Sequence, residues 1–386
     1  MTSSAFLTGN LPASNRMKKI LKMTLLVIGI LIGLIVLLTV IFLNVAPQLG
    51  AKKINIQEAL IQNSPHYKEG KFENIEPTVV MKKFELKTFS GYFTRGNRVP
   101  DWSIPVEKLP TGYFNNPDSL TRITWFGHSA MLLEMDGQKI FIDPMLGNVP
   151  SPLAWLGSKR FNDTLPLSID SIPLLDAVII SHDHYDHLDY GSIIQINSKV
   201  KRYFVPLGLG SHLMAWGVEK EKISELNWWD TTSFEGIQLI ATPARHFSGR
   251  GILDRNKTLW SSWVIQGKSS NIFFGGDSGY DQSFKKIGDL YGPFDFAMLE
   301  CGQYNEQWPE IHMMPEEVVQ ANIDLKGKLL MPIHWGAFKL ALHRWDEPVE
   351  RMLAEAEKKN VRVATPRIGE PLIIGGVVPS ENWWKK

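Results

Sequence analysis

The stretch SHDHYDHLDY, residues 181–190, places three histidines and three aspartates within ten positions. It directly follows the run DAVII, residues 176–180, which is typical of a buried β-strand. Four of its side chains would repel one another or lack hydrogen-bond partners if they were buried without a cation: His182, His184, Asp186 and His187. Imidazole nitrogens and carboxylate oxygens are the usual ligands of borderline divalent metals. The stretch therefore predicts a metal-binding loop at the end of a strand.

The spacing of this loop suits two metal ions rather than one. His182 and His184 can share a first ion, while the adjacent Asp186 and His187 reach a second. Because Cys301 is the only cysteine, the remaining ligands must also offer nitrogen or oxygen. A single cysteine also excludes an intrachain disulfide.

Further candidate ligands follow other apolar runs. His246 comes after LIATPAR, Asp277 after NIFFGG and His334 after LLMPI. A carboxylate such as Asp277 can bridge two ions, and one histidine can complete each shell, which leaves a shared position for water. Taken singly, a histidine or aspartate at a strand end is more often an ordinary hydrogen-bonding residue. Together with the loop, these residues are those of an open, catalytic metal site.

Short β-branched and aromatic runs, separated by turn signals, predict a mixed α/β domain from Gly91 to the end of the chain, residues 91–386. The predicted strands are residues 121–126, 130–134, 139–142, 177–181, 238–242, 263–266, 272–275, 296–299 and 329–333. Helical patterns cover residues 315–325 and 348–359. Residues 46–90 include a short helix-like pattern at 54–62, and we expect this stretch to be a stalk or linker.

An uncharged run at residues 23–45, MTLLVIGILIGLIVLLTVIFLNV, is long enough to cross a bilayer as a helix. A cleaved signal peptide is the alternative, but its apolar part is normally shorter, and Ala46-Pro47 is a poor cleavage context. Basic residues are more numerous before the run, at 16, 18, 19 and 22, than after it, at 52 and 53. This bias predicts a cytoplasmic segment at residues 1–22 and a catalytic domain outside the cytoplasm, either periplasmic or extracellular.

The charge balance argues against a nucleic-acid partner. The chain has 41 basic and 40 acidic residues, a net charge of +1, and no long basic stretch beyond its N-terminus.

The motif SHDHYDHLD resembles the metal motif of the metallo-β-lactamase superfamily. Flanking stretches are similar to one branch of it, the N-acyl-phosphatidylethanolamine-hydrolysing phospholipases D: WFGHSAMLLEMDG, FIDPML, SPLAWLGSKRF, DRNKTLWSSWV, GGDSGY, HMMPEEVV and IHWGAFKL. The resemblance extends from Gly91 to about Leu372. It implies an αββα sandwich with the metals at one edge between the sheets, here preceded by one transmembrane helix.

The resemblance also implies a complete ligand set. Matched residue by residue, the first zinc shell falls on His182, His184 and His246. The second falls on Asp186, His187 and His334, with Asp277 as the bridge. His312 matches a histidine that is not a ligand but meets the substrate's phosphate or assists proton transfer, although a capping or packing role is the alternative. We therefore expect two divalent ions, Zn²⁺, and expect Asp186 and His312 to be catalytic.

Other noticeable residues receive ordinary roles. We expect His128 to be a structural hydrogen-bonding residue and Cys301 to be a packing residue. We assign no role to His66, His212 and His343. The apolar stretch VPSPLAWLG, residues 149–157, could form a lip over the metals or a packed loop, and the tryptophans are expected mainly in the core.

Together with the apolar run at residues 23–45, the resemblance implies a membrane-tethered dizinc phosphodiesterase. It would release phosphatidic acid and an N-acyl amino-alcohol from N-acyl-phosphatidylethanolamine or a related phospholipid, by attack of metal-bound hydroxide. Its partners would be the phospholipid and the membrane, and the resemblance allows a homodimer. One alternative is a hydrolase of the same fold acting on a soluble ester, lactone or phosphodiester. Another is a non-catalytic, membrane-tethered binding factor, against which the complete ligand set argues.

Overall fold

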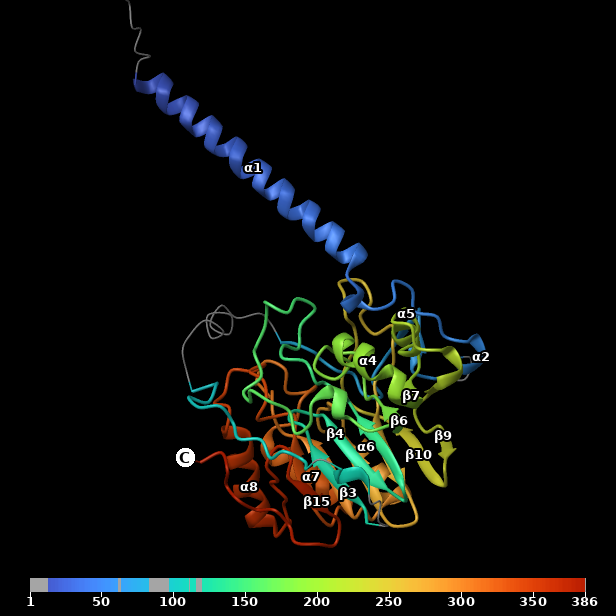
Figure 1. Cartoon of the computed structure of the whole chain (residues 1–386). Helices are drawn as coiled ribbons and strands as arrows, with labels where there is room; N and C mark the ends of the chain where they lie inside the picture. Colours follow the sequence, from blue (N-terminus) through green and yellow to red (C-terminus); the bar gives the residue numbers. More distant parts are fainter. Residues whose placement is uncertain (1–12, 62–63, 83–96, 111, 116–119, 386) are drawn as a thin grey trace, which may run out of the picture. The chain divides into compact units, whose positions relative to one another are not determined.

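The computed structural model describes residues 13–61, 64–82, 97–110, 112–115 and 120–385 (Figure 1). The chain falls into two compact units, Met1–Ala46 and Pro47–Lys386.

The described part of the first unit forms one long helix, α1 (Ala13–Val45). Its segment Arg16–Val45 has a mean hydropathy of 3.3, and none of its most apolar window is buried within the protein. The polar side chains of Thr39 and Asn44 donate hydrogen bonds to backbone carbonyls one turn earlier, those of Ile35 and Val40. A helix that is apolar all round and satisfies its own polar groups meets the requirements of a membrane span.

The second unit contains two mixed β-sheets. The seven-stranded sheet has the order β15-β3-β4-β5-β6-β7-β8, and the six-stranded sheet has the order β14-β13-β12-β11-β10-β9. The strands of the first sheet are β3 (Arg122–Trp125), β4 (Met131–Met135), β5 (Gln138–Ile142), β6 (Leu175–Ile179), β7 (Val200–Pro206), β8 (Ile223–Leu226) and β15 (Pro371–Ile373). Those of the second are β9 (Thr231–Phe234), β10 (Ile237–Thr242), β11 (Ser262–Gln266), β12 (Asn271–Phe274), β13 (Phe296–Glu300) and β14 (Leu330–Ile333).

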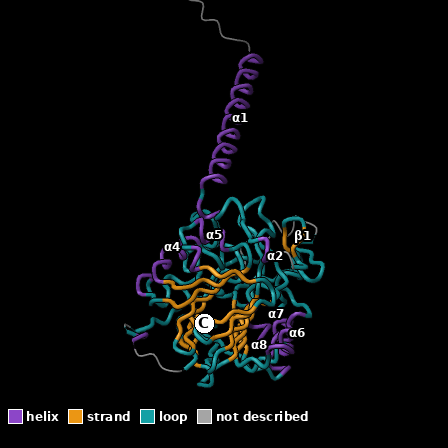
Figure 2. Tube along the Cα trace, turned by 90° about the vertical axis from the view of Figure 1, so that its right-hand side faces the viewer, coloured by secondary structure: helices purple, strands orange, loops and turns teal. Residues whose placement is uncertain are grey.

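Helices cover the outer faces of both sheets (Figure 2). On the first sheet lie α4 (Tyr190–Ile196) and α5 (Gly210–Ala215), which share a buried apolar cluster with β4 to β7. On the second lie α6 (Ser283–Tyr291), α7 (Pro315–Asp324) and α8 (Glu347–Lys359). Short 3-10 turns connect these elements: η1 (Pro47–Leu49), η2 (Tyr113–Asn115), η3 (Ile169–Ser171), η4 (Asn197–Lys199) and η5 (Lys220–Lys222). The result is the αββα sandwich that the sequence predicted.

Strand directions bring many loops to one edge of this sandwich. β5 to β8 run parallel to one another, as do β12 to β14. β3 and β10 run in the same direction as these strands within their own sheets, because two antiparallel pairings separate β3 from β5 and β10 from β12. Residues that follow the carboxyl ends of these strands are therefore collected at one edge of each sheet.

Part of the stretch expected to be a stalk is instead packed on the sandwich. It contains α2 (Glu58–Ile61) and the hairpin β1 (Tyr67–Lys68) and β2 (Lys71–Phe72). The side chain of Phe72 is fully buried, in a cluster with Leu207, Trp228 and Trp260. The described residues of this stretch after Ala46 thus belong to the same compact unit as the sheets. Residues 83–90 of that stretch lie outside the described part of the chain.

Each predicted strand and both C-terminal helices match an element within a few residues. The prediction missed β7, β8, β9 and β15 and the helices α4 to α6. Most tryptophans are buried, including Trp228, Trp383 and Trp384, as expected for core packing.

Candidate metal centre

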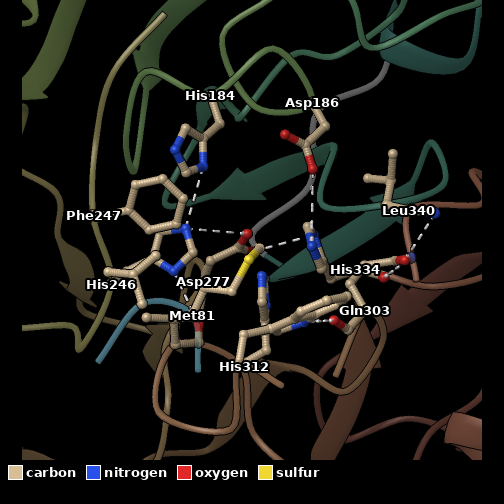
Figure 3. Close-up of a pocket in the computed structure, with 13 residues that line it drawn as sticks. Met81, His184, Asp186, His246, Phe247, Asp277, Gln303, His312, His334 and Leu340 are labelled. Atoms are coloured by element: carbon tan, nitrogen blue, oxygen red, sulfur yellow. Dashed lines mark hydrogen bonds and ion pairs between the residues drawn. The ribbon is translucent and has the colours of Figure 1, made fainter. Parts of the chain in front are cut away.

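The predicted ligands meet at the edge where the strands of both sheets end (Figure 3). The loop after β6 supplies residues 182–187, and β10, β12 and β14 are followed by His246, Asp277 and His334. The ligating atoms form two groups, each with its atoms within 4.8 Å of one another. The first contains His182, His184, His246 and Asp277, and the second contains His128, Asp186, His187 and His334.

The imidazole nitrogens of the first group face one another closely. His184 Nδ1 lies 2.9 Å from His182 Nε2 and 3.2 Å from His246 Nε2. Two ligand atoms of a tetrahedral zinc with bonds of ~2.0–2.1 Å lie roughly 3.3 Å apart. The spacing of these nitrogens therefore suits a shared cation.

Hydrogen bonds on the far side of the rings fix their tautomers. His246 Nδ1 donates to the carbonyl oxygen of Ile311 at 2.9 Å, and His187 Nδ1 donates to Asp143 Oδ2 at 2.7 Å. Ser181 Oγ donates to Asp143 at 2.6 Å and accepts from His182 Nδ1 at 2.9 Å. The protons on Nδ1 leave Nε2 of the neutral His182 and His246 rings with a lone pair toward the centre, as in rings that bind a metal.

Asp277 lies between the two groups. Its Oδ2 is 3.9 Å from His182 Nε2 and 3.8 Å from His246 Nε2. Its Oδ1 is 3.2 Å from both His187 Nε2 and His334 Nδ1. One carboxylate thus faces both sets of nitrogens, which is the placement of a bridging ligand.

The second group includes one histidine that we expected to be structural. His128 Nε2 lies 2.9 Å from Asp186 Oδ2, and Asp186 Oδ2 lies 3.7 Å from His187 Nε2 and 3.8 Å from His334 Nε2. His128 therefore forms a structural hydrogen bond, as expected, and its partner is Asp186, which the ring holds in place. The backbone N–H of His334 also donates to the carbonyl oxygen of His128 at 3.0 Å, which joins the two sheets at the site.

The electrostatics of the site favour bound positive charge. Burial lowers the pKa of His184 to about 4 and holds the pKa values of His182, His246 and His334 well below their usual range, so these rings are neutral. Burial raises the pKa of Asp277 to about 6. Burial alone would lower the pKa of His187, but Asp277 and Asp186 raise it well above its usual value. Divalent metals bind neutral imidazoles and carboxylates, so a cation at this centre would displace the second proton that the carboxylates otherwise hold on His187.

Buried polar atoms of the site also lack partners. Among the described residues, His187 Nε2 and Asp277 Oδ1 lie 3.2 Å apart, but neither makes a hydrogen bond of normal geometry although both are buried. Such atoms are costly unless a ligand satisfies them. These two buried atoms, the imidazole and carboxylate ligands, and the spacing of the nitrogens together fit a divalent metal ion at each group.

A cavity of about 210 Å³ opens above the centre (Figure 3). Its polar floor is made by His184, Asp186, His246, Asp277, His312 and His334. Its walls are largely apolar: Val80, Met81, Phe247, Trp308, Ile311 and Leu340, with Gln303. No sequence pattern indicated most of these wall residues, and two of them, Val80 and Met81, come from the stretch expected to be a stalk.

His312 lies in the cavity, next to Asp277 and His334, as the family resemblance implied. Its Nδ1 is 3.5 Å from Oε1 of the fully buried Glu300, which accepts a hydrogen bond from the backbone N–H of Met313 at 2.7 Å. Burial raises the pKa of Glu300 well above its usual range, so the neutral acid lies beside the ring. Burial lowers the pKa of His312, and the neutral ring can both donate and accept a hydrogen bond.

Several other candidates lie outside the centre. Cys301 is fully buried in the core, as expected for a packing residue. Residues 149–157 do not line the cavity above the metals but border a separate one, so they form no lip over the site. His212 contacts the ligand loop at a residue that is not a predicted ligand, with Nε2 at 3.4 Å from Asp183 Oδ2.

The sequence of this domain is similar to that of a known protein family. Residues 138–335 match the family described as the beta-lactamase superfamily domain. The chain belongs to this metallo-β-lactamase superfamily. A protein similar to it is an uncharacterized protein of Mycobacterium tuberculosis, 39% identical over 87% of this chain and 91% of that protein.

One named relative indicates the branch of the superfamily. The N-acyl-phosphatidylethanolamine-hydrolyzing phospholipase D 1 of Caenorhabditis elegans is 32% identical over 71% of this chain and 81% of its own length. Among solved structures, Igni18, a metallo hydrolase from Ignicoccus hospitalis, has the same fold, with a TM-score of 0.51, 21% identity and coverage of 66% of this chain and 97% of that one. The protein is a metal-dependent hydrolase of the metallo-β-lactamase fold, and it resembles the phospholipase D branch.

Proposed function

We propose that this hydrolase is a membrane-anchored dizinc phosphodiesterase of the phospholipase D type. It cleaves N-acyl-phosphatidylethanolamine, or a related phospholipid, to phosphatidic acid and an N-acyl amino-alcohol. The observation that supports this best is the pair of ligand groups around Asp277 directly below an apolar cavity. The named activity of the Caenorhabditis elegans relative supports the substrate class.

The proposed ligands divide between two zinc ions. His182, His184 and His246 would hold the first ion, and Asp186, His187 and His334 would hold the second. Asp277 would be shared by both, since its two oxygens face opposite groups. His128 and Asp143 are not ligands in this assignment but orient Asp186 and His187 through hydrogen bonds.

The protein's own residues then position the substrate and move protons. When bound, the two ions activate water for attack at phosphorus and neutralise the phosphodiester charge. Asp186 would act in catalysis as a ligand that helps to hold the second ion in the cavity floor. His312 points into the same space and hydrogen-bonds the phosphate or passes a proton to the departing alkoxide. The apolar walls exclude water and accommodate the start of an acyl chain.

The anchor is proposed to be α1, with the basic N-terminal segment in the cytoplasm. The basic residues before the span outnumber those that closely follow it, which favours an extracytoplasmic location for the catalytic unit. The phospholipid substrate would then come from the leaflet on that side.

A panel of defined substrates tests the proposed function. The purified full-length protein is incubated with N-acyl-phosphatidylethanolamine, phosphatidylethanolamine and phosphatidylcholine in vesicles, and with a soluble ester, lactone and phosphodiester. We expect phosphatidic acid and N-acyl amino-alcohol by mass spectrometry as the main products. Turnover of soluble compounds alone would support the same-fold alternative, and full metal content without any turnover would support a binding factor.

A further inference from the structure

Two loops of the second unit present large apolar side chains to solvent. In the loop at residues 149–157, Trp155 is 80% exposed and Leu156 is 54% exposed. In the loop at residues 249–255, Ile252 is 73% exposed and Leu253 is 84% exposed. Exposed apolar side chains that gather on one part of a protein surface are typical of sites that bind a partner or a membrane.

Both loops border the segment that follows the membrane span. The guanidinium of Arg250 donates to the carbonyl oxygen of Gln48 at 2.8 Å and 3.1 Å. Gln48 also lines a cavity of about 720 Å³ together with Val149, Pro152 and Ala154 of the first loop. Figure 1 shows both loops near α4 and α5 of the sandwich.

Residues 47–51 are themselves fixed to the body of this unit. Trp216 Nε1 donates to the carbonyl oxygen of Pro47 at 2.7 Å, and the backbone N–H of Ala51 donates to His212 Nδ1 at 2.9 Å. Gly50 has a φ of +77°, and a Cβ there would lie 2.0 Å from His212 Nδ1, so the chain passes directly over this ring. No free linker therefore separates this unit from Ala46.

Few residues separate this surface from the apolar helix in the sequence. Only Ala46 stands between Pro47 and Val45, the last residue of that helix. Two steps of ~3.8 Å allow at most about 8 Å between the Cα atoms of Val45 and Pro47. The bonds of Gln48 to Arg250 tie the second loop to the residue that follows Pro47.

We propose that the loops at residues 149–157 and 249–255 form a surface that docks on the bilayer in which α1 is anchored. This proposal rests on the membrane anchor of the proposed function. Trp155, Leu156, Ile252 and Leu253 enter the interface between headgroups and acyl chains, where tryptophan and leucine are favoured. Exposed basic side chains nearby, Lys52, Lys53, Lys159 and Arg255, suit anionic lipid headgroups.

Hydrogen bonds also connect the second loop of this surface to the backbone of the loop that carries the metal ligands. Arg250 Nη1 donates to the carbonyl oxygens of Asp183 and Leu188 in and after the ligand loop, at 2.5 Å and 2.8 Å. The guanidinium of Arg255 lies 5.0 Å from the ring centre of Phe247, a wall residue of the substrate cavity. Docking of the second loop therefore places the cavity wall beside the lipid surface, from which a phospholipid can enter.

Site-directed fluorescence tests this surface without relying on turnover. Trp155→Cys and Leu253→Cys are each labelled with an environment-sensitive fluorophore in the full-length protein, since the native Cys301 is buried. The matched control is Val377→Cys, 94% exposed, which follows β15 at the sheet edge opposite the metals. Each protein is reconstituted as one copy per nanodisc of phosphatidylcholine and phosphatidylglycerol, with quenchers attached to the acyl chains.

We expect several-fold stronger quenching and a blue-shifted emission at positions 155 and 253 relative to position 377. Leu156→Cys and Ile252→Cys provide a second pair if the first variants do not fold. Equal quenching at all labelled positions would overturn the proposal. A blue shift that develops in detergent as the protein concentration rises, with no quenching in nanodiscs, would also overturn it, because the surface would then bind a second copy of the chain. Neither result depends on the substrate, so the proposed function stands or fails separately.

Discussion

Replacing Asp277 with alanine is expected to lower the hydrolytic rate by more than about 10²-fold, since loss of an outer partner of a metal ligand alone costs ~10–100-fold. The variant removes the one carboxylate that faces both groups of nitrogens, at 3.2 Å on one side and 3.8–3.9 Å on the other. Without it, the two ions would repel each other across the space between the groups. Elemental analysis of the purified variant should therefore show less metal together with the lost activity.

The matched control is Asp281→Asn. Asp281 follows the same strand and is 8% exposed, but its carboxylate accepts from the backbone N–H of Ser283 and does not line the cavity. We expect this variant to keep its metal and most of its activity. Full occupancy by two metals in Asp277→Ala would show that the bridging assignment is wrong.

Asp143→Asn is expected to weaken metal binding by ~10–100-fold, the usual effect of removing an outer partner of a ligating histidine. The fully buried carboxylate accepts from His187 Nδ1 and from both the backbone N–H and the hydroxyl of Ser181. An amide can keep the bond to the backbone N–H, but its NH₂ group would face the His187 N–H or the Ser181 hydroxyl. The ring of His187 then loses its fixed tautomer, and Nε2 is no longer held as a lone pair toward the metals.

Competition with a chromophoric chelator measures this loss. Asp176→Asn is a suitable control, because Asp176 is a carboxylate of β6 that accepts from the backbone N–H of Lys139 and from Lys201, away from the metal edge. If Asp143→Asn and Asp176→Asn release metal at the same chelator concentration, then Asp143 does not support the site.

The ligand loop could be predicted from the sequence because its residues are neighbours in the chain. His182, His184, Asp186 and His187 need no tertiary information to be grouped. His246, Asp277 and His334 could be added because each follows an apolar run, and parallel strands collect their carboxyl ends at one edge.

Residues that support the ligands were harder to find. Asp143 also follows a strand, but nothing in the sequence distinguishes a carboxylate that faces a histidine from one that faces water. His128 was expected to form a structural hydrogen bond, but its partner could not be predicted. That partner, Asp186, is 58 residues away in the sequence and comes close to His128 because β3 and β6 belong to one sheet. Such contacts depend on strand order, which the sequence pattern does not specify.

Local polarity was misleading for residues 46–82. Their mixed polar and apolar pattern suggested a stalk, yet Phe72 is buried, and Val80 and Met81 line the cavity above the candidate metal centre. The surface onto which they pack is formed by residues about 130 to 230 positions later, so no local pattern predicts it. The same limit applies to residues 149–157, whose apolar side chains neither fill the core nor cover the metals.

The position of a heavy-oxygen label tests the central proposal most directly. N-acyl-phosphatidylethanolamine is hydrolysed by the purified protein in ¹⁸O-enriched water, and the products are separated by mass spectrometry. Attack of water at phosphorus, aided by two metals, places the label on the phosphate of phosphatidic acid and none on the N-acyl amino-alcohol. Label on the amino-alcohol would mean carbon–oxygen cleavage, and diacylglycerol or free fatty acid as the main product would mean attack at another bond. Either result would contradict a phospholipase D reaction even if both metals were bound.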